Sequence, residues 1–137
     1  MTDITAYIPQ RPPFVMVGEV LQADAKFSKT SFTIAADNLF VADDIFTEPG
    51  LVENMAQTAA AGTGYRYHQK GEQVPVGFIA AIKALKIYDR PKVGATLYTE
   101  VEITHTLMNV HVVVATVYVN DKKIASCEMK IFEQVIS

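Results

Sequence analysis

Cysteine and histidine are scarce in this sequence. Cys127 is the one cysteine among 137 residues, so no disulfide can form within the chain, which fits a reducing cytoplasm. His68, His105 and His111 are scattered along the chain and do not form the Cys/His spacing of a zinc site. We therefore expect neither a disulfide scaffold nor a metal centre.

A strong charge of one sign and a long apolar run are also missing. The formal net charge is -3, so no overall basic field favours nucleic acid. No apolar run approaches the roughly 18 uninterrupted residues of a membrane span. The start, MTDITAYIPQ, lacks the basic end and apolar core of a signal peptide. We expect a cytoplasmic protein that binds no nucleic acid and spans no membrane.

The chain has an ordinary globular composition, with 50% hydrophobic and 20% charged residues, and its length suits a single domain over residues 1–137. No Walker loop, GxGxxG or GxSxG motif occurs. The patterns predict a short helical turn before Pro9, a strand pair over 14–25 and 26–36, and a loop over 37–48. A helix over 49–68 follows, and then strands over 74–88, 95–109, 110–120 and 122–136.

The predicted helix is unusually slender, because alanine and glycine fill much of its middle, AQTAAAG. A slender helix allows another backbone to come close, as when a sheet wraps around it. One helix beside several antiparallel strands is an α+β arrangement. One helix cannot cover both faces of a long sheet unless the sheet curls around it or a second copy helps, so we expect two subunits to pair about a two-fold axis.

Three segments resemble the 3-hydroxyacyl-[acyl carrier protein] dehydratases. IPQRPPFVMVGEV is similar to the family's Leu-Pro-His-Arg-Tyr-Pro-Phe motif, and EPGLVENMAQTAAA to its Pro-Gly, Glu-Ala-Met-Ala-Gln-Ala-Ala helix motif. IAAIKALKIYDRPKVGATLYTEVEI is similar to its later strand segment. The gap between Pro-Gly and the glutamate is two residues shorter than in the housekeeping enzymes. In this the chain looks more like the accessory members of aryl polyene and flexirubin-type pigment synthesis.

The resemblance implies a hotdog fold, which is a curled antiparallel sheet wrapped around one long central helix. It implies a homodimer or higher oligomer, with a second hotdog protein as a further possible partner subunit. The implied substrate is an acyl thioester on acyl carrier protein, in fatty acid or polyene synthesis. This chemistry needs no cofactor and no metal.

Dehydration of a 3-hydroxyacyl thioester needs a base, an acid and donors that stabilise the enolate-like oxygen. In the family, a histidine and a carboxylate on the helix transfer the protons, and a backbone N–H at the helix N-terminus faces the thioester oxygen. The resemblance assigns the carboxylate to Glu53 and the backbone donor to Gly50. Gln57 lies one turn after Glu53, where it either orients that carboxylate or fills a polar gap.

The family's catalytic histidine is absent from the matching segment, ADNLFVADDIFTEPG, and Gln10 replaces the histidine of the first motif. Three interpretations follow. Another group, such as an aspartate of the loop or a histidine from elsewhere, replaces the base. Alternatively, Glu53 alone activates water, as in hotdog thioesterases. In the third, the protein binds acyl chains or assists a partner subunit without catalysis.

Several of these residues also have plain structural interpretations. If Gly50 is the N-cap, Glu53 is the third helical residue and completes a cap. His111 lies in a valine-rich segment, which is more typical of a core or interface histidine than of a catalyst. The basic residues of KALKIYDRPK are either a docking patch for acidic carrier proteins or ordinary solvated side chains.

Overall fold

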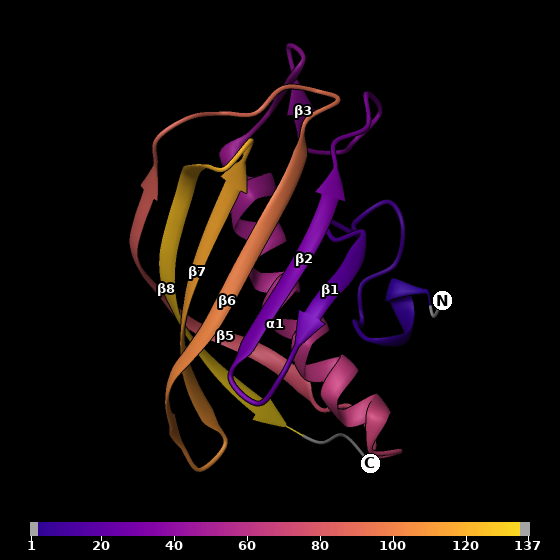
Figure 1. The fold of residues 1–137 in the computed structure, drawn as a ribbon, viewed down its shortest axis with the longest axis vertical. Coiled ribbons are helices and arrows are strands. Elements are labelled where there is room, and N and C mark those ends of the chain that lie inside the picture. Colours follow the sequence, from indigo (N-terminus) through magenta and orange to yellow (C-terminus); the bar gives the residue numbers. More distant parts are fainter. Residues whose placement is uncertain (1–2, 135–137) are drawn as a thin grey trace.

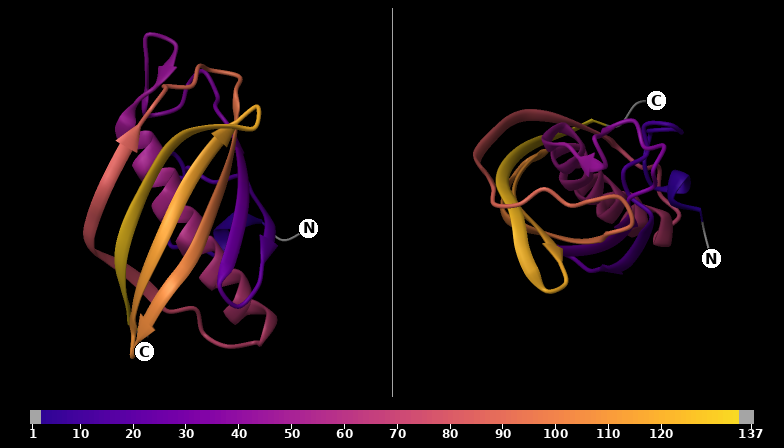
Figure 2. Two further views of the ribbon diagram at one scale, coloured as in Figure 1. Left: turned by 60° about the vertical axis from the view of Figure 1, so that its left-hand side comes forward. Right: turned by 90° about the horizontal axis from the view of Figure 1, so that it is seen from above.

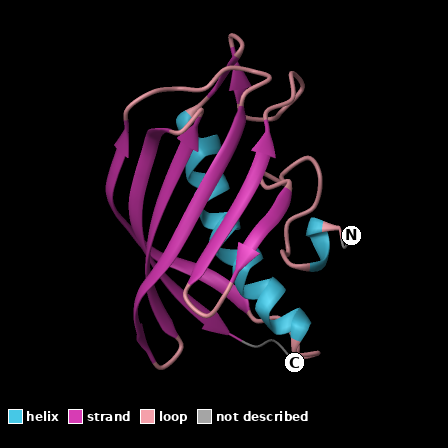
Figure 3. Ribbon diagram, in the orientation of Figure 1, coloured by secondary structure: helices cyan, strands magenta, loops and turns pink. Residues whose placement is uncertain are grey.

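The computed structural model describes residues 3–134, most of which lie in one curved antiparallel sheet and one long helix (Figures 1 and 3). The six strands of the sheet are hydrogen-bonded in the order β1-β2-β6-β7-β8-β5. They are β1 (Glu19–Ala23), β2 (Phe27–Thr33), β5 (Val76–Ile87), β6 (Thr96–Leu107), β7 (Val110–Val119) and β8 (Lys122–Gln134). The other elements are η1 (Ile4–Ala6), the small hairpin of β3 (Val41–Ala42) and β4 (Ile45–Phe46), and the helix α1 (Glu48–Gln69). The predicted α+β class is confirmed.

The sheet curls around α1, which runs along its concave side (Figure 2). The helix can approach closely because its later turns carry glycine where other elements touch it. A Cβ atom on Gly62 would overlap the side chain of Ser28 on β2, and one on Gly64 would overlap the backbone of Tyr7. The slender helix predicted from the sequence therefore serves a packing purpose.

The core forms where one face of α1 meets the inner face of the sheet. Leu51 and Met55 on the helix pack in one buried cluster with Leu97, Val113 and Met129 from β6, β7 and β8. Burying a side chain of this size contributes about 1.5–3 kcal/mol. Residues of odd number face inward in β7 and, from Ala125 on, in β8, because side chains alternate between the two faces of a strand.

The turn between β7 and β8 has the backbone conformation that its two central residues favour. Asn120 and Asp121 have φ values of 50° and 63°. Two successive residues with positive φ are typical of a type I′ hairpin turn, for which asparagine and aspartate are suited. The predicted turn at this position is confirmed.

The first predicted strand is shorter than expected, because β1 begins only at Glu19. Before it, the main chain at Met16 bonds to side chains of α1 instead of a neighbouring strand. The Met16 N–H donates to Gln57 Oε1 at 2.6 Å, and Asn54 Nδ2 donates to the Met16 carbonyl at 2.8 Å. Residues 14–18 therefore form an irregular segment that is held against the helix.

One edge of the sheet exposes several large apolar side chains. Strand β5 forms one edge and β1 the other. Both faces of β5 are largely exposed, and Phe78, Ile79, Ile82 and Leu85 are each 41–47% exposed. An open edge strand with apolar side chains is a surface that proteins normally cover.

Within residues 3–134, neither α1 nor any other helix is long and apolar enough to cross a membrane.

Candidate active site

Glu53 lies in the second turn of α1, and it does not cap the helix. The N-cap is Thr47, which makes Glu53 the sixth helical residue. The acidic residue of the first turn is Glu48, whose carboxylate pairs with Arg90 at 2.7 Å. The capping interpretation of Glu53 is therefore wrong, and this half-buried carboxylate needs another explanation.

Gln57 connects Glu53 to the irregular segment before β1. Its side-chain amide is buried and donates from Nε2 to Glu53 Oε2 at 2.9 Å and to the Phe14 carbonyl at 2.9 Å. Its Oε1 accepts the Met16 N–H. Because the segment fixes the amide from two sides, Gln57 can present only its donor group to Glu53. One carboxylate oxygen is thus held in place.

A chain of buried polar groups continues from the same helix face. Asn54 donates to the Met16 carbonyl and accepts a bond from the Thr99 hydroxyl of β6. The Thr58 hydroxyl donates to the Asn54 carbonyl and lies 2.8 Å from the hydroxyl of Thr30 on β2. These bonds satisfy polar groups that would otherwise be buried without partners, and they fix α1 relative to the sheet.

Gly50 is buried at the start of α1. A Cβ atom here would meet the ring of Phe46 and the side chain of Phe40, so the close packing requires glycine. Its N–H donates to the Thr47 carbonyl at 2.9 Å. The predicted role as a donor to a thioester oxygen stays a prediction, and a substrate oxygen would have to compete with this carbonyl.

A cavity between α1 and the inner face of the sheet has Glu53 in its wall. Further along the helix its wall is formed by Ala56, Ala59 and Ala60, and then by Thr63 and Arg66. The sheet contributes apolar side chains to the same cavity: Ile79, Val101, Ile103, Val113 and Ile131. A slot with a carboxylate near one end of the helical face and an apolar middle suits a chain-like ligand.

Gln10, which replaces a family histidine, also lines this cavity. Its Oε1 atom is buried and has no hydrogen-bond partner among the described residues. A buried polar atom without a partner is uncommon, and a ligand group in the cavity would satisfy it. The resemblance alone did not single out this residue for a role.

The aspartates of residues 37–47, which the sequence offered as substitutes for the missing histidine, are not part of the cavity wall. That wall instead contains His111 of β7 and Glu133 of β8. The His111 Nε2 atom lies 2.8 Å from Glu133 Oε1. A mostly buried position for His111 agrees with the interpretation from the sequence, and its place in the cavity wall adds to it. The signal for an inward-facing side chain is the odd parity that His111 shares with the buried Val113 of the same strand.

No cluster of three or more histidine, cysteine, aspartate or glutamate side chains that could hold a metal ion occurs in the part of the chain that the structure describes.

Comparison with known proteins places these features in context. A family model matches residues 2–135 of the chain, and its description is ApeP-like, ApeP dehydratase. No curated protein matches the chain. Among solved structures, it is similar to a chain of the dehydratase heterocomplex ApeI:P from Xenorhabdus doucetiae. That match has a TM-score of 0.89 at 14% identity and covers 97% of this chain and 91% of the other.

Two further structures share the fold at similarly low identity. The uncharacterized protein PH1136 from Pyrococcus horikoshii has a TM-score of 0.72 at 12% identity, with 96% of this chain and 94% of that chain covered. A hypothetical thioesterase with coenzyme A from Streptococcus pneumoniae TIGR4 has a TM-score of 0.68 at 10% identity, with 86% and 88% covered. Together with the wrapped helix, these likenesses confirm the predicted hotdog fold.

Proposed function

The chain belongs to the ApeP-like dehydratase family, and on that premise we propose that it dehydrates 3-hydroxyacyl thioesters with Glu53 as a proton-transfer group. The family match confirms the resemblance to the dehydratases that the sequence motifs indicated. The observation that carries the proposal is the Glu53 carboxylate, which lines an apolar cavity and is held by the buried Gln57 amide.

The reaction requires two proton movements. A base removes a proton from the carbon next to the thioester carbonyl, and the electron pair forms the new carbon–carbon double bond. The hydroxyl on the next carbon leaves with a proton from an acid, so that water and a 2-enoyl thioester result. A carboxyl group can carry either proton, and Glu53 in its protonated form is suited to assist the departing hydroxyl. No step requires a metal or an organic cofactor.

The second proton-transfer group is proposed to come from another hotdog subunit. The wall of the cavity around Glu53 includes no residue of the loop in which the family carries its histidine, and the histidine that this wall does include, among the described residues, is His111 of β7. The exposed β5 edge, with Ile79 in the cavity wall and Ile82 and Leu85 outside it, offers a surface for such a subunit. The similar Xenorhabdus doucetiae chain is part of a heterocomplex. A homodimer is the alternative assembly.

Two further elements of the proposal concern substrate binding. Gly50 would donate its N–H to the thioester oxygen when that oxygen displaces the Thr47 carbonyl, which now accepts the bond. The acyl group would arrive on acyl carrier protein, which is acidic. Lys83, Lys86 and Lys92 are all exposed near β5 and suit that contact.

We place the reaction in the cytoplasm and in fatty acid or aryl polyene synthesis. Support for the location comes from the lone Cys127, which is free and buried. Support for the pathway comes from the resemblance to accessory members of pigment synthesis.

Product analysis separates the competing functions. The full chain, alone and with a second hotdog subunit, is incubated with a 3-hydroxyacyl thioester, and the products are identified by mass spectrometry. The proposal expects a 2-enoyl thioester and water. Release of a free thiol would favour a thioesterase in which Glu53 activates water. Chain binding without any product would favour an acyl-binding subunit.

A further inference from the structure

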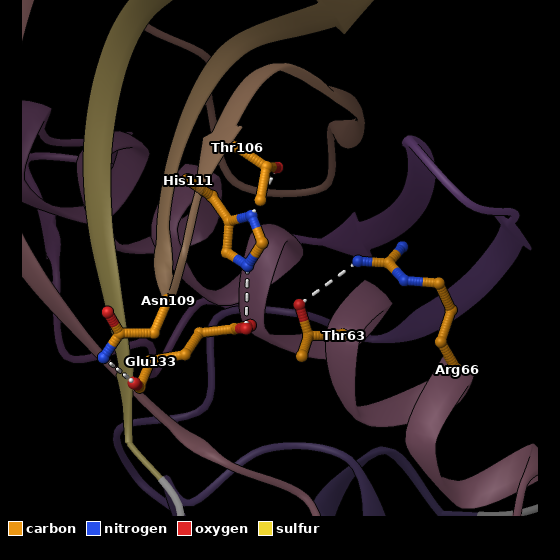
Figure 4. Close-up of polar contacts among 6 residues, drawn as sticks. All are labelled: Thr63, Arg66, Thr106, Asn109, His111 and Glu133. Atoms are coloured by element: carbon orange, nitrogen blue, oxygen red, sulfur yellow. Dashed lines mark hydrogen bonds and ion pairs between the residues drawn. The ribbon is translucent and has the colours of Figure 1, made fainter.

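The far end of the cavity is polar, although its middle is apolar. Thr63 and Arg66 lie ten and thirteen residues after Glu53 on the same helix, which places Thr63 about 15 Å further along the helix axis. His111 and Glu133 face them from the sheet (Figure 4). Charged groups at this end could bond a polar group of a ligand whose apolar part lies in the middle of the cavity.

These polar groups are organised by hydrogen bonds. Figure 4 shows the His111 ring between Glu133 and Thr106, with Nε2 lying 2.8 Å from Glu133 Oε1 and Nδ1 lying 2.8 Å from Thr106 Oγ1. The side chains of His111 and Glu133 are only 20% and 15% exposed. The pair is therefore held in place and largely shielded from water.

Arg66 supplies donors to the same region. Its Nη2 donates to Thr63 Oγ1 at 3.2 Å, and its Nη1 donates to the Asp24 carbonyl at 3.0 Å. Burial lowers the pKa of Arg66, and the carboxylates of Glu133 and Asp24 partly offset this. The positive charge of Arg66 and the negative charge of Glu133 thus act on the same small space.

Open space continues beyond these residues. A second hollow is lined by Thr63, Arg66, Ile103, His111 and Glu133, all of which also line the main cavity. It adds Lys26, Tyr67 and Thr106, among others, to the wall. The polar residues therefore border two neighbouring hollows, and the end of a long ligand in the main cavity would meet them.

We propose that Arg66, His111 and Glu133 form a tail subsite, which binds the far end of the acyl chain and selects chains that end in a neutral hydrogen-bonding group such as a hydroxyl. This inference rests on the proposed function, because it assumes that the reacting end of the chain lies at Glu53.

Chemical complementarity favours a neutral polar end. A hydroxyl can donate to the Glu133 carboxylate and accept from the Arg66 guanidinium, so it would add a hydrogen bond to those that each charged group already makes. A carboxylate end would be repelled by Glu133, and an ammonium end by Arg66. A methyl end would remove water from these groups without replacing its hydrogen bonds, which is unfavourable.

The test compares the affinities of two chains that differ only at the end. An extended chain covers at most about 3.6 Å for three backbone bonds, so about 15 Å corresponds to about a dozen bonds. Saturated acyl-pantetheine thioesters of this length, ending in a methyl or a hydroxyl group, are titrated calorimetrically into the full-length protein. They lack the 3-hydroxyl group, so binding is measured without dehydration.

We expect the hydroxyl-ended chain to bind about fivefold to tenfold more tightly. The substitutions His111→Leu, Glu133→Gln and Arg66→Met are each expected to reduce this ratio to about one without loss of methyl-ended binding. His105→Leu is the matched control, since His105 is exposed on β6 outside the cavity wall, and it should keep the wild-type ratio. Circular dichroism shows which variants fold, and the expected loss of preference can be tested with any one folded variant.

Three results would overturn the tail subsite. Equal or tighter binding of the methyl-ended chain to the wild-type protein would contradict it while leaving the proposed dehydratase function intact. An unchanged preference in the folded variants would show that other residues recognise the end. If neither chain binds, both the tail subsite and the acyl cavity of the proposed function fail together.

Discussion

Gln57 holds Glu53 through a hydrogen bond of 2.9 Å between residues that are one helical turn apart. The same amide bonds the main chain at Phe14 and Met16, more than forty residues earlier in the sequence. The buried Gln57 side chain thus links the Glu53 carboxylate to the irregular segment of residues 14–18, which is held against α1. Activity and stability should both depend on it.

Replacement of Gln57 by leucine tests this link. The change leaves the buried Met16 N–H without its partner and removes the donor to the Phe14 carbonyl, which should lower the free energy of unfolding by about 1–3 kcal/mol. Urea denaturation measures the loss. Gln69→Leu, at the exposed end of the same helix, is the control and should change stability little. Equal losses of unfolding free energy in the two variants would show that the Gln57 hydrogen bonds add no stability beyond that of an exposed helix residue.

The close approach of α1 to β2 predicts that Gly62→Ala is destabilising. The new methyl group would overlap the Ser28 side chain, and overpacking of this kind costs about 1–3 kcal/mol. A second substitution, Ser28→Gly, removes the overlapping atoms and should recover part of the loss. The double-mutant cycle is measured by thermal unfolding, and purely additive effects would contradict the close contact.

The exposed β5 edge predicts an oligomer that depends on apolar side chains. Ile82→Lys should weaken subunit association, because it places a charge where a partner would bury an apolar surface. Light scattering and sedimentation measure the association. Leu107→Lys is the control, since Leu107 is 76% exposed at the tip of the β6–β7 hairpin, away from this edge. If Leu107→Lys dissociates the oligomer and Ile82→Lys does not, the interface lies at the β6–β7 hairpin and not at the β5 edge.

Cys127 is predicted to be unreactive in the folded protein. Burial raises the pKa of its thiol to about 11, so it carries no appreciable thiolate at pH 8. Because the raised pKa lies above the usual range, reactivity should appear only as the pH approaches 11 or when the chain unfolds. Labelling with iodoacetamide, followed by mass spectrometry, measures this. Rapid labelling of the native protein at pH 8 would show that the thiol is accessible.

Local patterns were sufficient to predict much of this protein. The slender helix, the alternating strands and the Asn120–Asp121 turn all depend on neighbouring residues, and each is present. The spacing of Glu53 and Gln57 likewise places them on one face of a helix. Resemblance to the dehydratases added the hotdog fold, which composition and periodicity alone do not specify.

Long-range contacts explain what the sequence did not predict. The irregular path at Met16 depends on side chains of Asn54 and Gln57 that are distant along the chain. The pairing of His111 with Glu133 depends on the register of β7 against β8. Each residue had the inward parity of its strand, but only the three-dimensional structure shows that the two meet inside the cavity.

The central claim is that Glu53 transfers a proton during dehydration. The most direct test is the rate at which the full assembly converts a 3-hydroxyacyl thioester to the 2-enoyl product, measured for the wild type, Glu53→Gln and Glu72→Gln. Glu72 is exposed just beyond α1 and outside the cavity wall, so its variant should retain the wild-type rate. We predict a loss of about 10²–10⁴-fold for Glu53→Gln with unchanged folding. A folded Glu53→Gln variant with the wild-type rate would contradict the account.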